Sequence, residues 1–434
     1  MKMGSIKTFV AGLALVSFSA LPAVADGPVQ QVGLFAKKAE ECAKDSKKAA
    51  KKKASDSKKK ASDSKKKAGC DADAGCDGDN GGCNLLQRAM NKTGLGRALS
   101  DAGVKVSGWA QFGYHSDSNG LFNSHPDDFN LHQLWFSARK AADGSDGTSL
   151  GFAADLVYGV DGPDVQSIGN PDEGDFDRGG DWTRGGGYGW AMPQLYAEIQ
   201  RGDLNLIGGH FFSPVGYEQV AAPENFFYSR SKTMYNRPLT HTGLLAKYNI
   251  TEELETSFGW TAGWDTGFDR RTGADQGSNL LASVGFTPIE GISLTYVALL
   301  GDFGSRRRVN DGPADVQLGE GYMHSVVASL DILDDVKYVV QSNLRETNAA
   351  TANDQISITN YLQYDINDTL AAGARIEWFK SDGASEYDVT FGLNIKPRDC
   401  LVIRPEIRTD WGNGIAAPET DDRSIFGIDM ILSY

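Results

Sequence analysis

The last residues of the chain, Phe426-Gly-Ile428-Asp-Met430-Ile-Leu432-Ser-Tyr434, point to its fold class. Apolar side chains alternate with mostly small or polar ones up to a terminal aromatic residue. In a β-strand this order places a greasy face opposite a wetter one, as the wall of a lipid-embedded β-barrel requires. A buried edge strand of a secreted sandwich would show the same pattern, so the rest of the chain has to decide.

The first 25 residues predict export. Lys2 and Lys7 form a short basic start, residues 8–20 are apolar or small, and residues 23–25 (Ala-Val-Ala) form a small-x-small cleavage site. The apolar run is shorter than the about 20 residues that a membrane-anchoring helix needs. No later stretch approaches about 18 continuous apolar residues, so an exported chain that crosses a membrane must do so as a barrel.

Composition is compatible with such a barrel. The chain has 51 glycines, 10% aromatic residues and a net charge of −14. Its mean hydropathy is −0.36, a value typical of soluble proteins. In a porin-like barrel, polar residues that face the lumen offset the apolar residues that face lipid. The alternative class is a secreted all-β protein such as a sandwich array or a lectin.

Residues 26–102 differ in composition and predict a periplasmic, tether-like segment. Within it residues 36–68 are rich in Lys and contain the repeat Lys-Lys-Lys-Ala-Ser-Asp-Ser at 51–57 and 58–64. The period is seven, yet apolar a and d positions are missing, which argues against a coiled coil. Self-repelling lysines indicate a solvated spacer. Alternatively, the polycation binds an anionic cell-wall polymer or lipid headgroups; nucleic acid is a poor partner for an exported chain.

The same segment is rich in cysteine and aspartate. Cys42, Cys70, Cys76 and Cys83 predict disulfides in an oxidising compartment, with a connectivity that spacing does not reveal. Cys400 is either a free thiol or the partner of one of these four. A weak calcium candidate consists of Asp71, Asp73, Asp77 and Asp79. The EF-hand spacing and its terminal Glu are missing, and zinc spacing is weaker still, so no metal or cofactor is expected. Residues 84–100 predict a short amphipathic helix interrupted by Gly94 and Gly96.

From residue 103 to the end the alternation is sustained. Residues 150–160, 254–264, 292–300 and 387–395 each place apolar or small side chains at every second position. About sixteen such segments, within a range of 14 to 18, have the roughly ten-residue length of a tilted membrane-spanning strand. Aromatic residues recur near segment ends, as interfacial girdles require, at Tyr158, Trp264, Trp378 and Trp411.

Short and long connections alternate along the chain. Short turns are predicted at 201–203, 249–252, 288–291, 333–335, 367–369 and 396–399. Long loops are predicted at 115–130, 161–189, 213–240, 265–277, 301–320 and 412–422, with 140–148 a longer turn and 381–385 a short loop. Tight turns on one side and long loops on the other are typical of an outer-membrane barrel, whereas Greek-key connections of a sandwich do not sort in this way. The sequence therefore predicts an all-β, up-and-down transmembrane barrel with both ends in the periplasm.

Residues 103–434 resemble the outer-membrane β-barrel porins of the OmpL-like type. The residues that carry the likeness are Gly108-Trp109, Asp155-Leu-Val-Tyr-Gly-Val-Asp161, Gln194-Leu-Tyr-Ala-Glu198, Gly209-His-Phe-Phe-Ser-Pro-Val-Gly-Tyr-Glu218, Pro238-Leu-Thr-His-Thr-Gly243 and Gly263-Trp-Asp265. The resemblance implies a porin-type barrel. It brings no catalytic or binding residues, and residues 26–102 lie outside it.

Inward-facing charges and the third long loop suggest how such a pore would be lined. The wall candidates are Arg345, Arg375, Glu377, Arg404, Glu406 and Arg408, and the loop candidates are Glu218, Glu224, Arg230 and Arg237. In porin-like barrels a loop at this place often folds into the lumen. A basic wall facing carboxylates would create a transverse field that filters solutes; alternatively, the charges only solvate a wide lumen. The acidic outer loops favour cations and the inner arginines favour anions, so selectivity stays open.

Catalysis is the least favoured class. His210 and His241 flank the third long loop, and Ser213 or Ser229 could lie nearby, yet the chain has no nucleophile-elbow motif. The sequence therefore predicts a non-enzymatic outer-membrane porin for passive diffusion of small hydrophilic solutes or ions, surrounded by outer-membrane lipids and assembled as a homotrimer. A structural anchor, tethered to the cell wall through the Lys-rich segment, is the alternative.

Overall fold

The computed structural model describes residues 85–144, 147–167, 176–177, 187–268, 277–306, 316–349, 354–413 and 422–434. The predicted signal peptide, the Lys-rich repeat, four of the five cysteines and the candidate calcium ligands Asp71, Asp73, Asp77 and Asp79 lie outside these residues. They remain predictions.

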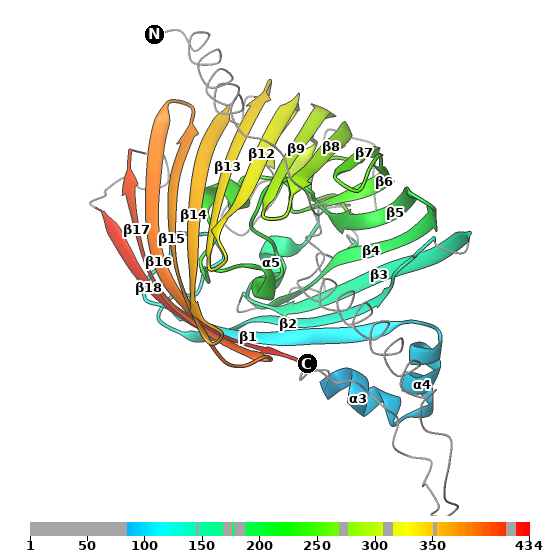
Figure 1. Ribbon diagram of the computed structural model, residues 1–434. Coiled ribbons are helices and arrows are strands. Elements are labelled where there is room, and N and C mark those ends of the chain that lie inside the picture. Colours follow the sequence, from blue (N-terminus) through cyan, green and yellow to red (C-terminus); the bar gives the residue numbers. More distant parts are fainter. Residues whose placement is uncertain are drawn as a thin grey trace, which may run out of the picture.

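Sixteen of the described strands close into one antiparallel barrel in which each strand pairs with its neighbours in the chain and β1 pairs with β18 (Figure 1). The fold class predicted from the sequence is confirmed. The barrel strands are β1 (Lys105–His115), β2 (Phe129–Lys140), β3 (Thr148–Gly159), β4 (Gly189–Arg201), β5 (Leu204–Phe212), β6 (Thr240–Asn249), β7 (Leu254–Thr261), β8 (Ser278–Ile289), β9 (Ile292–Asp302), β12 (Glu320–Leu333), β13 (Val336–Thr347), β14 (Gln355–Asn367), β15 (Leu370–Ser381), β16 (Ala384–Arg398), β17 (Leu401–Gly412) and β18 (Arg423–Ser433). A separate ribbon consists of β10 (Ser305–Arg306) and β11 (Val316–Gln317).

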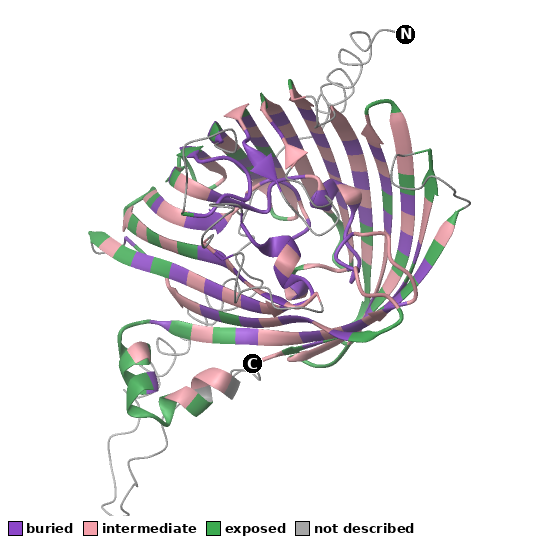
Figure 2. Cartoon of the chain, turned by 180° about the vertical axis from the view of Figure 1, so that it is seen from behind, coloured by how far each residue is buried: buried purple, intermediate pink, exposed green. Residues whose placement is uncertain are grey.

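Burial alternates along the strands because successive side chains point to opposite faces of the wall (Figure 2). On the outer face large apolar side chains are exposed, for example Leu244 at 67% and Phe391 at 56%. On the inner face the buried residues are largely polar or charged. Lipid can solvate the first set and not the second, which is the arrangement of a membrane-spanning barrel.

The terminal aromatic residue takes part in closing the barrel. The backbone of Tyr434 exchanges hydrogen bonds with Gly108 of β1, at 2.9 and 3.1 Å, and its hydroxyl donates to the carbonyl oxygen of Trp135 at 3.0 Å. A side chain at Gly108 would meet both that carbonyl and the Tyr434 ring. A glycine is therefore required where the last residue of the chain crosses the first strand.

The connections sort as predicted. One end of the barrel has the tight turns, such as 202–203, 290–291, 334–335 and 399–400. The other end has the long loops 116–128, 160–188, 213–239, 262–277, 303–319 and 413–422, and also 348–354, which the sequence did not indicate. The short loop at this end is Asp382-Gly383, where both residues have positive φ, as a tight hairpin turn of the I′ class needs.

Two helices precede the barrel, α3 (Leu85–Asn91) and α4 (Gly94–Asp101), where the sequence predicted one interrupted helix. The break falls at Thr93, whose hydroxyl accepts from the Gly96 amide and starts α4. The Gln87 side chain accepts a hydrogen bond from the Val106 amide and so fastens α3 to β1. Among the helices of the described residues, none combines the length and apolar character of a membrane span.

Candidate functional site

The connection between β5 and β6, residues 213–239, folds into the barrel interior, and we name it L3 (Figures 1 and 2). It contains a short 3-10 helix, η2 (Ala222–Glu224), and one turn of α-helix, α6 (Lys232–Tyr235). Most of its residues are buried. The interior position predicted for the third long loop is therefore observed, and it determines where the charged wall residues make their contacts.

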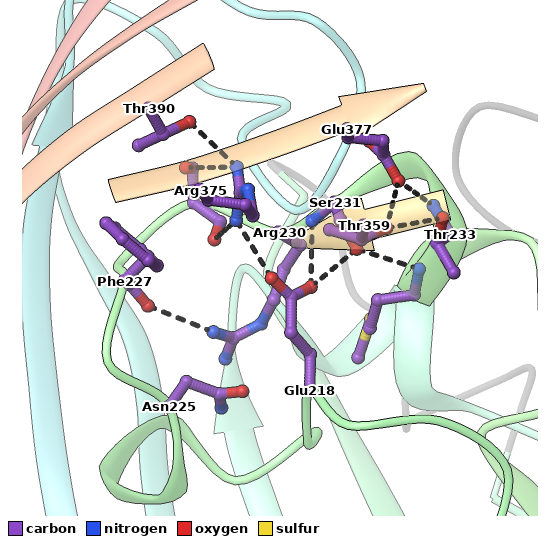
Figure 3. Close-up of polar contacts among 12 residues, drawn as sticks. Glu218, Asn225, Phe227, Arg230, Ser231, Thr233, Thr359, Arg375, Glu377 and Thr390 are labelled. Atoms are coloured by element: carbon purple, nitrogen blue, oxygen red, sulfur yellow. Dashed lines mark hydrogen bonds and ion pairs between the residues drawn. The ribbon is translucent and has the colours of Figure 1, made fainter. Parts of the chain in front are cut away.

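Carboxylates of the wall bind the backbone of L3. Glu406 of β17 accepts hydrogen bonds from the amides of Tyr228 and Ser229, both at 2.9 Å. Glu377 of β15 accepts from the amide of Lys232 at 2.8 Å. It also accepts from the amide of Thr233 at 2.7 Å (Figure 3). Each carboxyl group thus satisfies two consecutive buried N–H groups of L3, which would otherwise be left without hydrogen-bond partners.

Arginines of the wall bind the carbonyl groups of the same loop. Arg375 donates to the carbonyl oxygen of Ser229 at 2.9 Å and to the carboxylate of Glu218 at 2.9 Å (Figure 3). Arg404 donates to the carbonyl oxygen of Asn225 at 2.7 Å. Arg408 donates to that of Arg230 at 2.5 Å. The wall therefore binds both the N–H groups and the C=O groups of the L3 main chain.

Each of these arginines also has a carboxylate partner on the wall. Arg404 pairs with Asp429 at 2.5 Å, Arg408 with Asp410 at 2.6 Å, and Arg375 with Asp388 at 3.4 Å. Asp388 and Asp429 were not among the residues predicted from the sequence. In the sequence each of the two stands between apolar neighbours, on β16 and on β18. This alternation predicts that the aspartate side chain faces the barrel interior. The three guanidinium groups are almost fully buried, so these partners offset much of the cost of removing them from water.

Aromatic residues of L3 pack where the wall has glycine. A Cβ atom at Gly373 would lie 2.4 Å from the Phe226 ring, and one at Gly113 would lie 2.2 Å from the Tyr228 hydroxyl. Gly392 stands in the same way beneath Phe227, whose ring also faces the Arg375 guanidinium, 5.4 Å from its centroid. Each of the three consecutive aromatic residues of L3 thus packs in a socket above a wall glycine. Any other residue type at the glycine position would place its side chain in that socket.

L3 also contacts the wall through a buried series of hydrogen bonds that starts at Tyr228. The Tyr228 hydroxyl lies 2.6 Å from Nε2 of His132, and Nδ1 of His132 lies 2.9 Å from Asp161. The Tyr228 ring stacks on His115 with ring centroids 4.0 Å apart. Neither histidine was singled out from the sequence, because both lie far along the chain from residue 228, His115 on β1 and His132 on β2.

The remaining predicted residues have different positions. Arg230 and Arg237 are buried inside L3 and donate to its own carbonyl groups, Arg230 to that of Val220 and Arg237 to that of Pro238. Arg345 is buried on β13, with its guanidinium 5.7 Å from the Trp264 ring centroid. Among the ten predicted residues, Glu224 alone is exposed within the barrel.

Glu224 lies at the tip of η2, and it differs from the other carboxylates in its ionisation. Although its side chain reaches lumen water, the surrounding loop and wall desolvate it and raise its pKa to about 7. The charge of Asp155 raises the pKa further, and the Arg139 guanidinium opposes both effects. Glu224 therefore changes charge near neutral pH.

The histidines that flank L3 make buried hydrogen bonds next to it. Nε2 of His241 lies 3.1 Å from the Ser213 hydroxyl, and Nδ1 of His210 lies 2.8 Å from the Thr242 hydroxyl. A Ser–His pair is therefore present, as the catalytic alternative requires. However, Nδ1 of His241 faces the Gly263 carbonyl oxygen at 3.0 Å and not an orienting carboxylate, and both side chains are buried. The contact joins the start of L3 to β6.

A second interior region is apolar. Eleven buried residues pack together inside the barrel on the side of β5 to β12. The list is Ile207, Phe211, Val215, Leu245, Trp264, Leu281, Val297, Leu299, Phe303, Leu318 and Met323. Val215 belongs to L3, so the loop is in contact with an apolar cluster near its start and with the charged wall in its later part.

The comparisons agree with this architecture. Residues 103–434 match the family described as "Putative beta-barrel porin-2, OmpL-like". The chain belongs to this family. A search of curated proteins finds no match. As a porin of this family with a closed sixteen-strand barrel, it is an outer-membrane channel protein, and the predicted family and location are confirmed.

The chain is similar to solved porin structures at low sequence identity. OprB of Pseudomonas putida is 16% identical, with a TM-score of 0.54 over 79% of this chain and 97% of that one. The trimer form of OmpT from Vibrio cholerae is 13% identical, with a TM-score of 0.49 over 76% and 99%. The anion-selective porin from Comamonas acidovorans is 9% identical, with a TM-score of 0.49 over 76% and 99%.

At the tight-turn end of the porin, Cys400 lies between β16 and β17 and is disulfide-bonded. The free-thiol alternative is therefore wrong. The backbone carbonyl of Cys400 accepts from the Ser433 amide at 2.9 Å, which places it beside the strand that ends the chain.

Proposed function

We propose that this porin lets small hydrophilic solutes or ions diffuse passively across the outer membrane, through a lumen that L3 narrows. The observation that carries the proposal is the fixed position of L3, whose backbone is bound by Glu377, Glu406 and three wall arginines. A closed barrel of about sixteen strands is wide enough for an aqueous channel. A loop held in one place inside it defines an opening of constant size.

The ten residues predicted to line the pore have two roles in this proposal. Glu224 meets solutes directly, since it is exposed inside the barrel. The buried members, Arg345, Arg375, Glu377, Arg404, Glu406, Arg408, Glu218, Arg230 and Arg237, act through the position and the field of L3. The proposed function is non-enzymatic, and the proposed assembly is a homotrimer, the common state of general porins of this size.

The second candidate function is a structural anchor in the outer membrane. It is favoured by the covalent bond of Cys400 at the end of the barrel where the N-terminal helices pack. In this alternative the Lys-rich residues 36–68 bind an anionic cell-wall polymer through their charge. Anchoring and diffusion can coexist, so the state of the lumen decides which of them is primary.

The test is single-channel conductance of the refolded protein in a planar bilayer, with the reversal potential measured under a salt gradient. Steady ohmic steps support passive diffusion, and the sign of the reversal potential gives the charge preference. Repeated insertions without conductance would overturn passive diffusion and make the anchor the leading function. Deletion of residues 36–68 is the matched variant, which should leave conductance unchanged and reduce binding to isolated cell wall.

A further inference from the structure

His115 occupies a closed position behind L3. Its ring is 3% exposed, stacks on Tyr228, and lies edge-on to His132 with centroids 5.8 Å apart. Nδ1 of His115 has no hydrogen-bond partner among the described residues. Gly113 and Gly427 leave the room in which the Tyr228 ring lies against this imidazole. A neutral ring suits this buried, stacked position, and a protonated ring does not.

Charged groups surround His115 on every packed element. The groups that a proton on His115 would face with like charge are His132 of β2, Arg408 of β17 and Arg230 of L3. The carboxylates of the same region already have partners: Asp429 binds Arg404 and Gln111, Asp161 binds His132 and Gln133, and Glu406 binds two L3 amides.

Glu406 is the carboxylate that would pair with a protonated His115, because both side chains border Gly427. The Cγ atom of Glu406 and Nδ1 of His115 each lie 3.3 Å from the position that a Cβ atom would take on Gly427. If Glu406 turned to a protonated His115, it would leave the amides of Tyr228 and Ser229 unpaired. If it stayed, the imidazolium would remain beside two guanidinium groups. Both outcomes weaken the attachment of L3 around Tyr228.

We propose that His115, stacked on Tyr228, is a proton-sensitive latch that holds L3 on the wall at neutral pH and releases its middle segment in acid. The proposal rests on the proposed function only for its consequence, a wider lumen. Burial raises the pKa of Tyr228 well above its usual value, so the Tyr228 hydroxyl stays protonated throughout this range. The proton that matters is therefore on an imidazole.

The direct test is hydrogen exchange of L3 in the full-length, refolded protein at pH 7.5 and pH 5.0, corrected for the intrinsic exchange rate. We expect the protection of residues 225–231 to fall at least about tenfold in acid. In His115→Phe, which keeps the stack but cannot take up a proton, protection should stay within about twofold. His324→Phe is the matched control, because His324 lies on the outer face of β12, and it should respond as the parent does.

A parallel conductance measurement separates this latch from the proposed function. All variants carry Glu224→Gln, so that Glu224 does not titrate. Larger conductance steps at pH 5.0 in the parent, absent in His115→Phe, support both proposals. Loss of protection without any conductance supports the latch and overturns passive diffusion. If His115→Phe loses protection in acid as the parent does, or if the parent keeps its protection, the latch is wrong.

Discussion

Glycine at inward-facing wall positions gives the aromatic residues of L3 room against the barrel. Gly373, Gly392 and Gly113 each stand beneath one ring of Phe226, Phe227 and Tyr228. In a sequence such glycines look like interruptions of a strand, since glycine weakens a strand interior. Their reason is visible only when the loop lies on the wall, because the contact joins residues far apart in the chain.

Replacing Gly373 should displace L3. In Gly373→Ala the new Cβ would lie 2.4 Å from the Phe226 ring, so the ring has to move, at a cost of about 1–3 kcal/mol for an overpacked site. We expect faster exchange of residues 222–228 and an altered conductance step. Gly208→Ala is the control, since its nearest neighbour is the flexible end of Leu244 at 3.2 Å. Equal behaviour of the two variants would contradict the socket.

Glu224 predicts a pH-dependent selectivity. Its pKa of about 7 lies above the usual value because the surrounding loop and wall desolvate it, so the carboxyl is mostly neutral at pH 6 and charged at pH 8. The cation-to-anion permeability ratio should rise with pH, by about twofold for one charge beside a narrow path. The reversal potential of the parent and of Glu224→Gln at both pH values measures this effect. A shift that persists in Glu224→Gln would have to come from another group.

At the scale of elements, L3 behaves as a bound peptide segment. Wall carboxylates accept from its amides and wall arginines donate to its carbonyl oxygens, so its place depends on β15 and β17 as well as on its own aromatic side chains. The strands themselves need no such partner, since the alternation of their side chains matches lipid on one face and a polar interior on the other.

Removing Arg375 should therefore loosen the loop without opening the barrel. Arg375→Met leaves Glu218 and Asp388 without their shared partner, a loss of about 3–5 kcal/mol for a broken buried pair. We expect earlier unfolding of L3 in hydrogen exchange, with the strands still protected. Arg423→Met breaks an exposed pair with Asp117 and should cost about 0–1 kcal/mol. If both variants exchange alike, Arg375 does not hold L3.

At the scale of the whole molecule, we predict that the disulfide of Cys400 joins the barrel to the N-terminal segment, which contains the other four cysteines of the sequence, at positions 42, 70, 76 and 83. Tryptic digestion without reduction should yield the peptide 399–408 linked to a peptide from that segment, because trypsin does not cleave between Arg404 and Pro405. Reduction should separate the two peptides. Cys400→Ser should abolish the linked species while the barrel still folds. A free 399–408 peptide before reduction would show that the bond does not form in the protein.

The sequence alone determined the fold class, the approximate number of strands and the sorting of turns from loops. These features follow from local periodicity, in which each residue reports whether it faces lipid or the interior. It also indicated that the loop at 213–240 enters the lumen, through the resemblance to porins.

Only the tertiary structure decided how that loop is held. The sequence identified Glu377, Glu406 and the wall arginines as inward charges, but it could not show that they bind the backbone of L3, because main-chain groups carry no sequence signal. His115, His132 and Gly373 were missed for the related reason that their partners in L3 are about a hundred or more residues away in the chain. Strand periodicity is a local property, whereas the position of a loop inside a barrel depends on pairings across the whole closed wall.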